Sequence, residues 1–199
     1  FLRFSAGVVL VRVWATLRFD DTKAITPSST QALDGLWRYE LARTKTTGPG
    51  RKRQTVHSYI SRHAYFAVPS WHDTFMELLS EGPLAYPRDY LVPLPAPGMD
   101  DVVEGMADVG DVLAIERTLF EALRAPAFVR AGSKITWHSG PKCLLLPGMG
   151  DYWSTHSARK VLPSLAGALQ AIPPWQVDQL GRWDRGGAAD YTQTQADCV

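Results

Sequence analysis

The apolar run that opens the chain constrains the fold more than any other stretch. It reads FLRFSAGVVLVRVWATLRF over residues 1–19, and Arg3, Arg12 and Arg18 interrupt it. The uninterrupted apolar stretch is too short to span a bilayer, and a secretory signal does not carry an arginine in the middle of its apolar region. The run therefore predicts a buried helix over residues 3–17 of a soluble protein that is not secreted. Because the first residue is phenylalanine rather than methionine, we expect a fragment of a longer product.

The composition is that of an ordinary globular protein. The chain has 199 residues, of which 45% are hydrophobic and 21% are charged, and it can build one substantial core. We therefore treat residues 1–199 as a single domain. Cys143 and Cys198 provide neither a disulfide framework nor the spacing of a zinc site, and the five histidines do not cluster with acids or cysteines. The sequence predicts no metal site and favours a reducing compartment.

The net charge of +1 conceals two segments of opposite charge. Residues 38–62 hold seven basic residues and one acidic residue, whereas residues 99–121 hold seven acidic residues and one basic residue. The basic segment could follow a polyanion. The acidic segment must face away from DNA or bind another partner. Charge alone is equally compatible with two ordinary solvated surfaces.

A Gly-Pro-Gly sequence at residues 48–50 lies within the basic segment and predicts a tight turn. Aromatic and aliphatic residues flank it within residues 36–41 and 56–60. This arrangement predicts a β-hairpin over residues 35–60.

The remaining pattern is mostly helical. We expect helices that start at Ser70 and end near Leu79, that cover residues 108–126 and end at Pro126, that cover residues 156–171, that cover Pro174–Leu180, and that include Tyr191. Prolines at positions 93, 95 and 97 predict an extended path, and Pro163 either kinks its helix or marks the first turn. The predicted fold class is α+β, mainly α, with one small antiparallel sheet.

Five short motifs, taken in order, resemble the catalytic domain of the tyrosine recombinases, the phage-integrase superfamily. They are LRFDD, the basic hairpin RTKTTGPGRKR, THSAR, LGRW and ADYTQT. The residues at their centres are Arg18 with Asp21, Lys45, His156 with Arg159, Trp183 and Tyr191. The motifs look closest to those of crypton-type recombinases of eukaryotic mobile elements. Each motif alone is common by chance, so the order of all five carries the resemblance.

The resemblance implies a helical catalytic domain that breaks and rejoins DNA at specific sites through a 3′-phosphotyrosyl intermediate. This is the chemistry of DNA recombination and DNA integration, and it needs no cofactor. Tyr191 is the expected nucleophile, and Arg18 and Arg159 are expected to bind the non-bridging phosphate oxygens. Lys45, with Lys52 as the alternative, is expected to protonate the leaving 5′-oxygen.

The other motif residues have more than one expected role. His156 either accepts the tyrosine proton or holds the phosphate, because imidazole titrates near neutrality. Trp183 stands where many members of the family have histidine. Its indole N–H can donate a hydrogen bond but cannot titrate, so it is either a donor to the phosphate or a packing residue. Asp21 is expected to orient an arginine.

The choice of residue types also follows from the chemistry itself. A tyrosine ester of phosphate preserves the bond energy, so that the DNA 5′-hydroxyl can reverse the reaction. Negative charge accumulates on the non-bridging oxygens in the transition state. Two guanidiniums can meet these oxygens with rigid pairs of N–H donors, which lysine does less well.

The expected partner is duplex DNA, with self-association into a dimer or tetramer on the DNA, and neither a membrane nor a small-molecule cofactor. The residues expected to contact the DNA backbone are Arg43, Arg51, Lys52, Arg53, Lys160 and Arg182. The expected compartment is the nucleus in a eukaryote and the cytoplasm otherwise.

One departure from the family leaves alternatives open. The family carries an N-terminal DNA-clamp domain that this sequence lacks, so we expect weak, non-specific and salt-sensitive DNA binding. A catalytically inactive DNA-binding relic of a mobile element is the main alternative to an active enzyme. A helical protein-interaction domain is a third reading.

Overall fold

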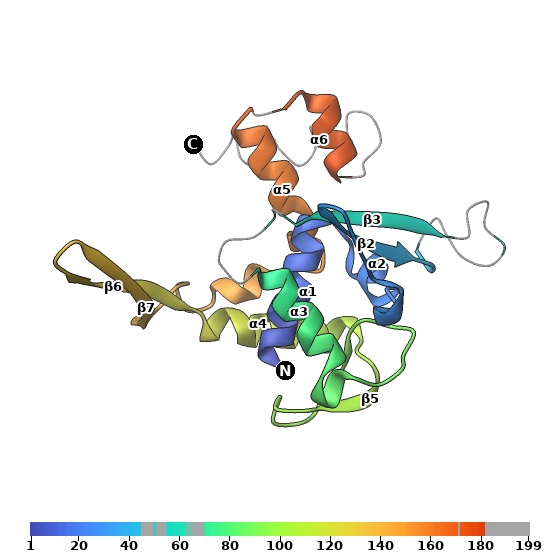
Figure 1. Ribbon diagram of the computed structural model, residues 1–199, viewed down its shortest axis with the longest axis horizontal. Helices are drawn as coiled ribbons and strands as arrows, with labels where there is room; N and C mark the ends of the chain where they lie inside the picture. The colour runs from blue at the N-terminus through green and yellow to red at the C-terminus, as the bar shows by residue number, and fades with distance from the viewer. Residues whose placement is uncertain (45–49, 51–54, 63, 65–69, 171, 182–199) are drawn as a thin grey trace.

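The computed structural model describes residues 1–44, 50, 55–62, 64, 70–170 and 172–181. Within these residues the chain is a mixture of α-helices and short antiparallel strands, which confirms the α+β class (Figure 1). The helices are α1 (Leu2–Trp14), α2 (Phe19–Lys23), α3 (Trp71–Ser80), α4 (Val109–Ala122), α5 (Ser157–Ala168) and α6 (Pro174–Gly181). The strands are β1 (Gln31–Leu33), β2 (Leu36–Leu41), β3 (Val56–Ser61), β4 (Pro93–Pro95), β5 (Val102–Met106), β6 (Arg124–Ala131) and β7 (Lys134–Cys143).

Helix α1 lies at the centre of the body, and α3, α4 and α5 all pack against it (Figure 1). Its residues Phe4, Val8 and Val11 are buried in the core. A helix that is apolar on almost every side must be enclosed by other elements, which is why this segment organises the fold. The helix predicted over residues 3–17 is confirmed, but it ends earlier, at Trp14. Thr16 takes a left-handed backbone conformation, with φ 50°, and turns the chain away.

The two strands of the predicted hairpin are present and belong to a three-stranded sheet, whereas the tight turn predicted at residues 48–50 lies largely outside the described residues. The strand order is β1-β2-β3, and β2 pairs with β3 in antiparallel register along its full length. Tyr39, Leu41 and Ile60 face the core, whereas Tyr59 is half exposed. This alternation is typical of a sheet with one buried face. An isolated bridge from Ile25 to Leu41 ties the segment after α2 to this sheet.

Side chains cap the N-termini of helices α3 and α4. Ser70 caps α3 as predicted, and its hydroxyl accepts the backbone N–H of His72 at 3.3 Å. Asp108 and Asp111 cap α4 reciprocally, since each carboxylate accepts the backbone N–H of the other residue at 2.9 Å. The second pair satisfies two N–H groups that the helix itself cannot bond.

The helix predicted over residues 108–126 is wrong at its C-terminal end. Helix α4 ends at Ala122, and Pro126 lies inside strand β6, which pairs with β7 to form an antiparallel ribbon. A proline is tolerated there because a two-stranded ribbon leaves some N–H groups facing solvent, and the register shifts between Arg124 and Pro126. Gly132, with φ 62°, forms the turn. The described residues therefore contain three small sheets rather than one.

The C-terminal elements follow the sequence closely. Helix α6 covers Pro174–Gly181, where a helix over Pro174–Leu180 was predicted. Helix α5 ends at Ala168 rather than near residue 171, and Pro163 lies in its interior rather than in its first turn. The proline-rich segment is extended as predicted and forms β4. The helix predicted around Tyr191 lies outside the described residues. None of the helices within the described ranges combines the length and apolar character needed to cross a membrane.

Candidate functional site

Two hydrogen bonds join the end of α1 to segments that are distant in the sequence. The Arg12 guanidinium donates to the carbonyl of Thr155 at 2.7 Å, directly before His156. The hydroxyl of Thr16 donates to the carbonyl of Leu180, near the end of α6, at 2.6 Å. The start of α5 and the end of α6 therefore both meet the end of α1.

A third contact joins α5 directly to the end of α6. Arg159, on α5, directs its Nε and Nη2 atoms at the carbonyl of Gly181, with Nε at 2.9 Å. Gly181 immediately precedes Arg182 and Trp183 in the LGRW motif. Together the three contacts bring the His-x-x-Arg motif and the start of the LGRW motif close to the α1 end that leads to Arg18.

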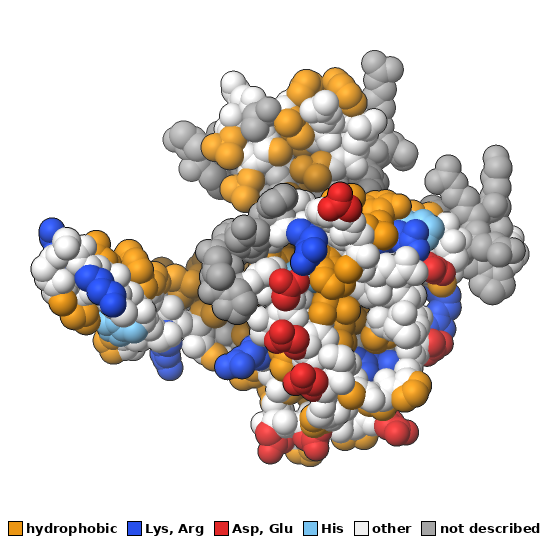
Figure 2. Space-filling view, viewed as in Figure 1, with side chains coloured by type: hydrophobic (Ala, Val, Ile, Leu, Met, Phe, Trp, Pro, Cys, Tyr) orange, Lys and Arg blue, Asp and Glu red, His pale blue; other side chains and the backbone are white. Residues whose placement is uncertain are grey.

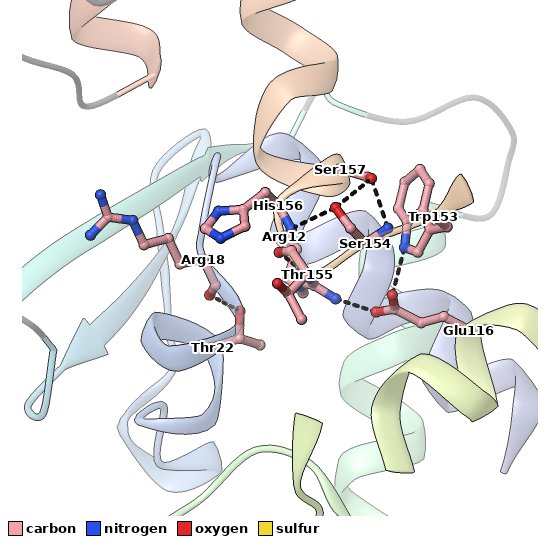
Figure 3. Close-up of polar contacts among 9 residues, drawn as sticks. All are labelled: Arg12, Arg18, Thr22, Glu116, Trp153, Ser154, Thr155, His156 and Ser157. Carbon is pink, nitrogen blue, oxygen red and sulfur yellow. Dashed lines mark hydrogen bonds and ion pairs between the residues drawn. The ribbon is translucent and has the colours of Figure 1, made fainter. Parts of the chain in front are cut away.

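A buried ion pair supports the His-x-x-Arg motif from below (Figure 3). Arg12 and Glu116 form a salt bridge with both side chains almost fully buried. The second carboxylate oxygen of Glu116 accepts the indole N–H of Trp153 at 2.5 Å. Helix α1, helix α4 and the segment before α5 are thereby locked together, which fixes where α5 begins.

Burial shifts both members of this pair away from their charged forms. Removal from water raises the pKa of Glu116, and the charge of Arg12 and the Trp153 hydrogen bond only partly oppose the shift. The same burial lowers the pKa of Arg12, against the opposing effect of Glu116. The pair therefore holds its charges at a cost in desolvation, and removal of either partner would leave a buried charge without compensation.

Arg18 lies at the start of α2 with a half-buried side chain. Its backbone N–H donates to the Asp21 carboxylate at 3.2 Å, and its carbonyl accepts the hydroxyl of Thr22 at 2.9 Å. Asp21 was predicted to orient an arginine; its contact with Arg18 is to the main-chain N–H at the start of α2, so that role stays a prediction. The guanidinium of Arg18 itself extends away from His156 in the view of Figure 3.

His156 is exposed at the start of α5. Its backbone N–H donates to the Ser154 hydroxyl at 3.4 Å, and Ser157 accepts the backbone N–H of Ser154 at 2.9 Å. The imidazole ring projects toward the segment that carries Arg18 (Figure 3). The ring is therefore open to an incoming ligand on the side where the first arginine motif lies.

Arg159, in contrast to the exposed His156, is buried, with 4% of its surface exposed. Its Nε and Nη2 atoms are the pair of donors that binds a carboxylate or phosphate side-on. In the structure this pair is directed at the carbonyl of Gly181. A phosphate could bind this edge of Arg159 only if the Gly181 carbonyl moved aside.

Of the remaining predicted site residues, Lys160 and Arg43 lie within the described part of the chain. Lys160 follows Arg159 on α5 and is half buried. Arg43 is exposed and forms a surface salt bridge with Asp89, at 2.9 Å, while also donating to the carbonyl of Asp89 at 2.5 Å. The predicted residues that lie outside the described part of the chain are Lys45, Arg51, Lys52, Arg53, Arg182, Trp183 and Tyr191.

Arg12 and Glu116 were not predicted as positioning residues, although the sequence holds a signal for each. An arginine in the middle of an apolar helix must find a buried partner when that helix is enclosed. Glu116 follows Ile115 and lies four residues after Val112, both buried positions on α4. Glu116 belongs to the acidic segment that was expected to face away from DNA or to bind another partner, and its own carboxylate is internal.

The chain matches no known protein-family model and no characterised protein. Within the described ranges, no group of three or more histidine, cysteine, aspartate or glutamate side chains is placed to hold a metal ion.

Proposed function

We propose that this chain is the catalytic domain of an enzyme that breaks and rejoins DNA strands in the manner of the tyrosine recombinases. The observation that carries the proposal is the convergence at the end of α1. Hydrogen bonds from Arg12, Thr16 and Arg159 gather the starts of two motifs around the segment that leads to Arg18. These are the motifs that the chemistry requires to be close together.

In the proposed reaction, the hydroxyl oxygen of Tyr191 attacks the scissile phosphorus and the bond from phosphorus to the 5′-oxygen breaks. His156 accepts the tyrosine proton or holds the phosphate. Lys45 or Lys52 gives a proton to the leaving 5′-oxygen. Attack by a 5′-hydroxyl on the phosphotyrosine reverses these steps, so resealing needs no cofactor.

Arg18 and Arg159 stabilise the negative charge on the non-bridging oxygens in this proposal. The Gly181 carbonyl occupies the Nε and Nη2 edge of Arg159 as a phosphate oxygen would. DNA binding therefore replaces one oxygen acceptor by another, and the end of α6 shifts as it does so. Since Leu180 is bonded to Thr16, this shift is transmitted to the segment before Arg18.

The burial of Arg159 also favours a second candidate function. An arginine that is already satisfied by a backbone carbonyl can stabilise the α5–α6 pair without meeting any substrate. In that case the chain is a DNA-binding module that does not cleave. Both candidates predict an affinity for duplex DNA that falls steeply with salt.

A suicide substrate, in which a nick next to the cleavage site lets the short product diffuse away, distinguishes the two functions. We expect a covalent protein–DNA adduct with the wild-type chain and none with Tyr191→Phe. Tyr152→Phe is the matched control, since Tyr152 is an exposed tyrosine four residues before His156 in the sequence, and its replacement should leave the adduct unchanged. Salt-sensitive DNA binding without an adduct, over a panel of random duplexes, would instead establish the non-catalytic module.

The role of Arg18 is tested by the same assay. Arg18→Ala should reduce the rate of adduct formation by about 10²–10³, the effect of removing one preorganised donor to a developing oxyanion. Arg3→Ala, an exposed arginine on α1, should leave the rate unchanged. Equal rates for the two variants would remove Arg18 from the catalytic group.

A further inference from the structure

The β6–β7 ribbon extends away from the helical body, and most of its side chains are exposed on both faces (Figure 1). An isolated two-stranded ribbon is only marginally stable in water, because neither face is buried. Figure 2 shows the ribbon as a mixture of apolar and basic side chains.

One face of the ribbon is aromatic. Phe128 pairs with Trp137 across the two strands, and their ring centroids lie 5.3 Å apart. The next pair toward the turn on the same face is Arg130 with Ile135. Both rings are largely exposed, at 57% for Phe128 and 64% for Trp137. Large aromatic rings exposed as a pair point to a ligand that covers them.

The charge of the ribbon indicates what kind of ligand this is. Residues 124–143 contain no aspartate or glutamate, and their basic residues are Arg124, Arg130, Lys134 and Lys142. None of the salt bridges within the described part of the chain involves these four residues. A surface that carries cations without carboxylates is complementary to a polyanion.

We propose that the β6–β7 ribbon is a DNA-binding arm, in which bases stack on the Phe128–Trp137 face and the basic side chains contact phosphates. The identity of the nucleic acid as DNA rests on the proposed function; the stacking and charge arguments do not. Aromatic side chains stack on bases of any sequence when the bases are unpaired. The arm therefore prefers single-stranded or locally opened DNA, whereas duplex DNA engages mainly its cations.

A second copy of the chain fits the ribbon less well than DNA. A symmetric contact between two ribbons would place the same cations opposite each other with no acidic residue between them. Such like-charge contacts are repulsive. The aromatic face alone does not decide between the two partners, but the charge does.

The test measures binding of the full chain to a fluorescent single-stranded oligonucleotide and to the matching duplex, by anisotropy over a series of salt concentrations. The aromatic variant is Phe128→Ala with Trp137→Ala. Its control is Trp175→Ala, another half-exposed tryptophan, on α6. The aromatic variant should lose about tenfold or more in affinity for the single strand, within the range that stacking of one base supplies, and less for the duplex.

The charge variant is Arg130→Gln with Lys134→Gln. Its control is Arg3→Gln with Lys23→Gln, which removes the same charge from the helical body. The charge variant should weaken binding to both oligonucleotides and reduce the slope of log affinity against log salt by about 1.4 for the single strand, because two phosphate contacts are lost. The control should change affinity less than twofold.

Equal binding by the wild type and both ribbon variants would overturn the proposal. A change in sedimentation of the aromatic variant, with DNA affinity unchanged, would overturn it in favour of self-association. The suicide-substrate assay separates this proposal from the proposed function. If the wild type forms the adduct and the ribbon variants bind DNA as well as the wild type does, only the proposal of a DNA-binding arm is contradicted. If the wild type forms no adduct and the ribbon variants lose DNA binding, the arm is supported and only the catalytic role is contradicted.

Discussion

The helical body around α1 buries a basic residue, whereas the β6–β7 ribbon exposes its basic residues. In the body, Arg12 is fully buried, and its two terminal guanidinium nitrogens donate to Glu116 and to the Thr155 carbonyl. In the ribbon, Arg130 and Lys134 are exposed, and no acidic residue lies within residues 124–143. A buried cation requires its partner inside the chain, whereas an exposed one can take its partner from another molecule.

The tryptophans repeat this contrast. Trp153 in the body packs against Phe120 and donates its indole N–H to Glu116. Trp137 in the ribbon contacts the ring of Phe128, and most of its surface meets solvent. In the body, the indole of Trp153 therefore stabilises the fold, whereas in the ribbon the ring of Trp137 is accessible to another molecule.

The largest expected effect is in the buried ion pair. Arg12→Ala should lower the free energy of unfolding by about 3–5 kcal/mol, because it leaves the Glu116 carboxylate buried without its cation. Urea unfolding followed by circular dichroism measures the change. The double variant Arg12→Met with Glu116→Met should recover most of the loss, since it removes both charges and keeps the volume. Arg3→Ala on the same helix is the control; a loss as large as that of Arg12→Ala would contradict the contrast between buried and exposed cations.

The next effect is a pH dependence in the body at His72. The ring is buried, stacks on Trp37 and contacts the Tyr39 hydroxyl, and burial together with the charge of Arg62 lowers its pKa to about 4. The unfolded chain takes up this proton near pH 6.5, before the folded chain does. The contribution of His72 is therefore complete above pH 6.5 and is lost as the pH falls toward 4, by about 3 kcal/mol.

Comparison of wild type with His72→Gln isolates this contribution from other titrating groups. The variant should lose most of the drop in stability between pH 7 and pH 4, as measured by urea unfolding at each pH. Glu116 works in the opposite direction, because its raised pKa makes the fold less stable as the pH rises above its unfolded value. His138→Gln, an exposed position in the ribbon, should keep the wild-type pH profile. An unchanged profile in His72→Gln would show that the ring is solvated.

A smaller effect is expected where α1 and α3 approach closely. A Cβ atom at Gly7 would lie 2.2 Å from the ring of Phe75, which is itself buried. Gly7→Ala should therefore destabilise the body by about 1–3 kcal/mol, despite the better helix propensity of alanine. Thermal unfolding checks the change. Adding Phe75→Leu should recover part of the loss by making room; a Gly7→Ala variant as stable as wild type would mean that the two helices separate easily.

The smallest effect is expected in the ribbon. Trp137→Ser should change the free energy of unfolding by no more than about 0.5 kcal/mol, because the ring buries little surface against the rest of the chain. Trp153→Phe, which removes the hydrogen bond to Glu116, is the matched comparison and should cost about 1–3 kcal/mol. Both are measured by urea unfolding. Equal losses would mean that the ribbon contributes to the fold as much as the body does.

The accuracy of prediction from the sequence depended on how local each signal was. The helix predicted at residues 3–17, the two strands that flank the Gly-Pro-Gly sequence and the helix from Pro174 all follow from short-range patterns, and all are present. Residues 124–126, at the start of β6, were wrongly assigned to the preceding helix because Pro126 usually ends a helix, and the glycine-punctuated stretch that follows fits several conformations. Pairing between the two strands, rather than either strand alone, decides their structure.

In the candidate site, too, local motifs identify residues, whereas the burial and contacts of those residues depend on distant segments. The sequence identifies Arg18, His156 and Arg159 from their motifs, but it does not show that Arg159 is buried against the Gly181 carbonyl. It also places Glu116 in an acidic segment without showing that the carboxylate points inward to Arg12. Both facts depend on which helices pack together, and no pattern within one helix contains them.

Local patterns in the sequence therefore establish the secondary-structure elements, the charge of each segment and the residue types available for chemistry. The packing of distant segments establishes which arginine is enclosed, which carboxylate neutralises it, and which aromatic pair is exposed on the ribbon. The physical reason is that helices and turns follow from interactions between near neighbours. The state of a charged or aromatic side chain depends instead on how much water the distant parts of the chain leave around it.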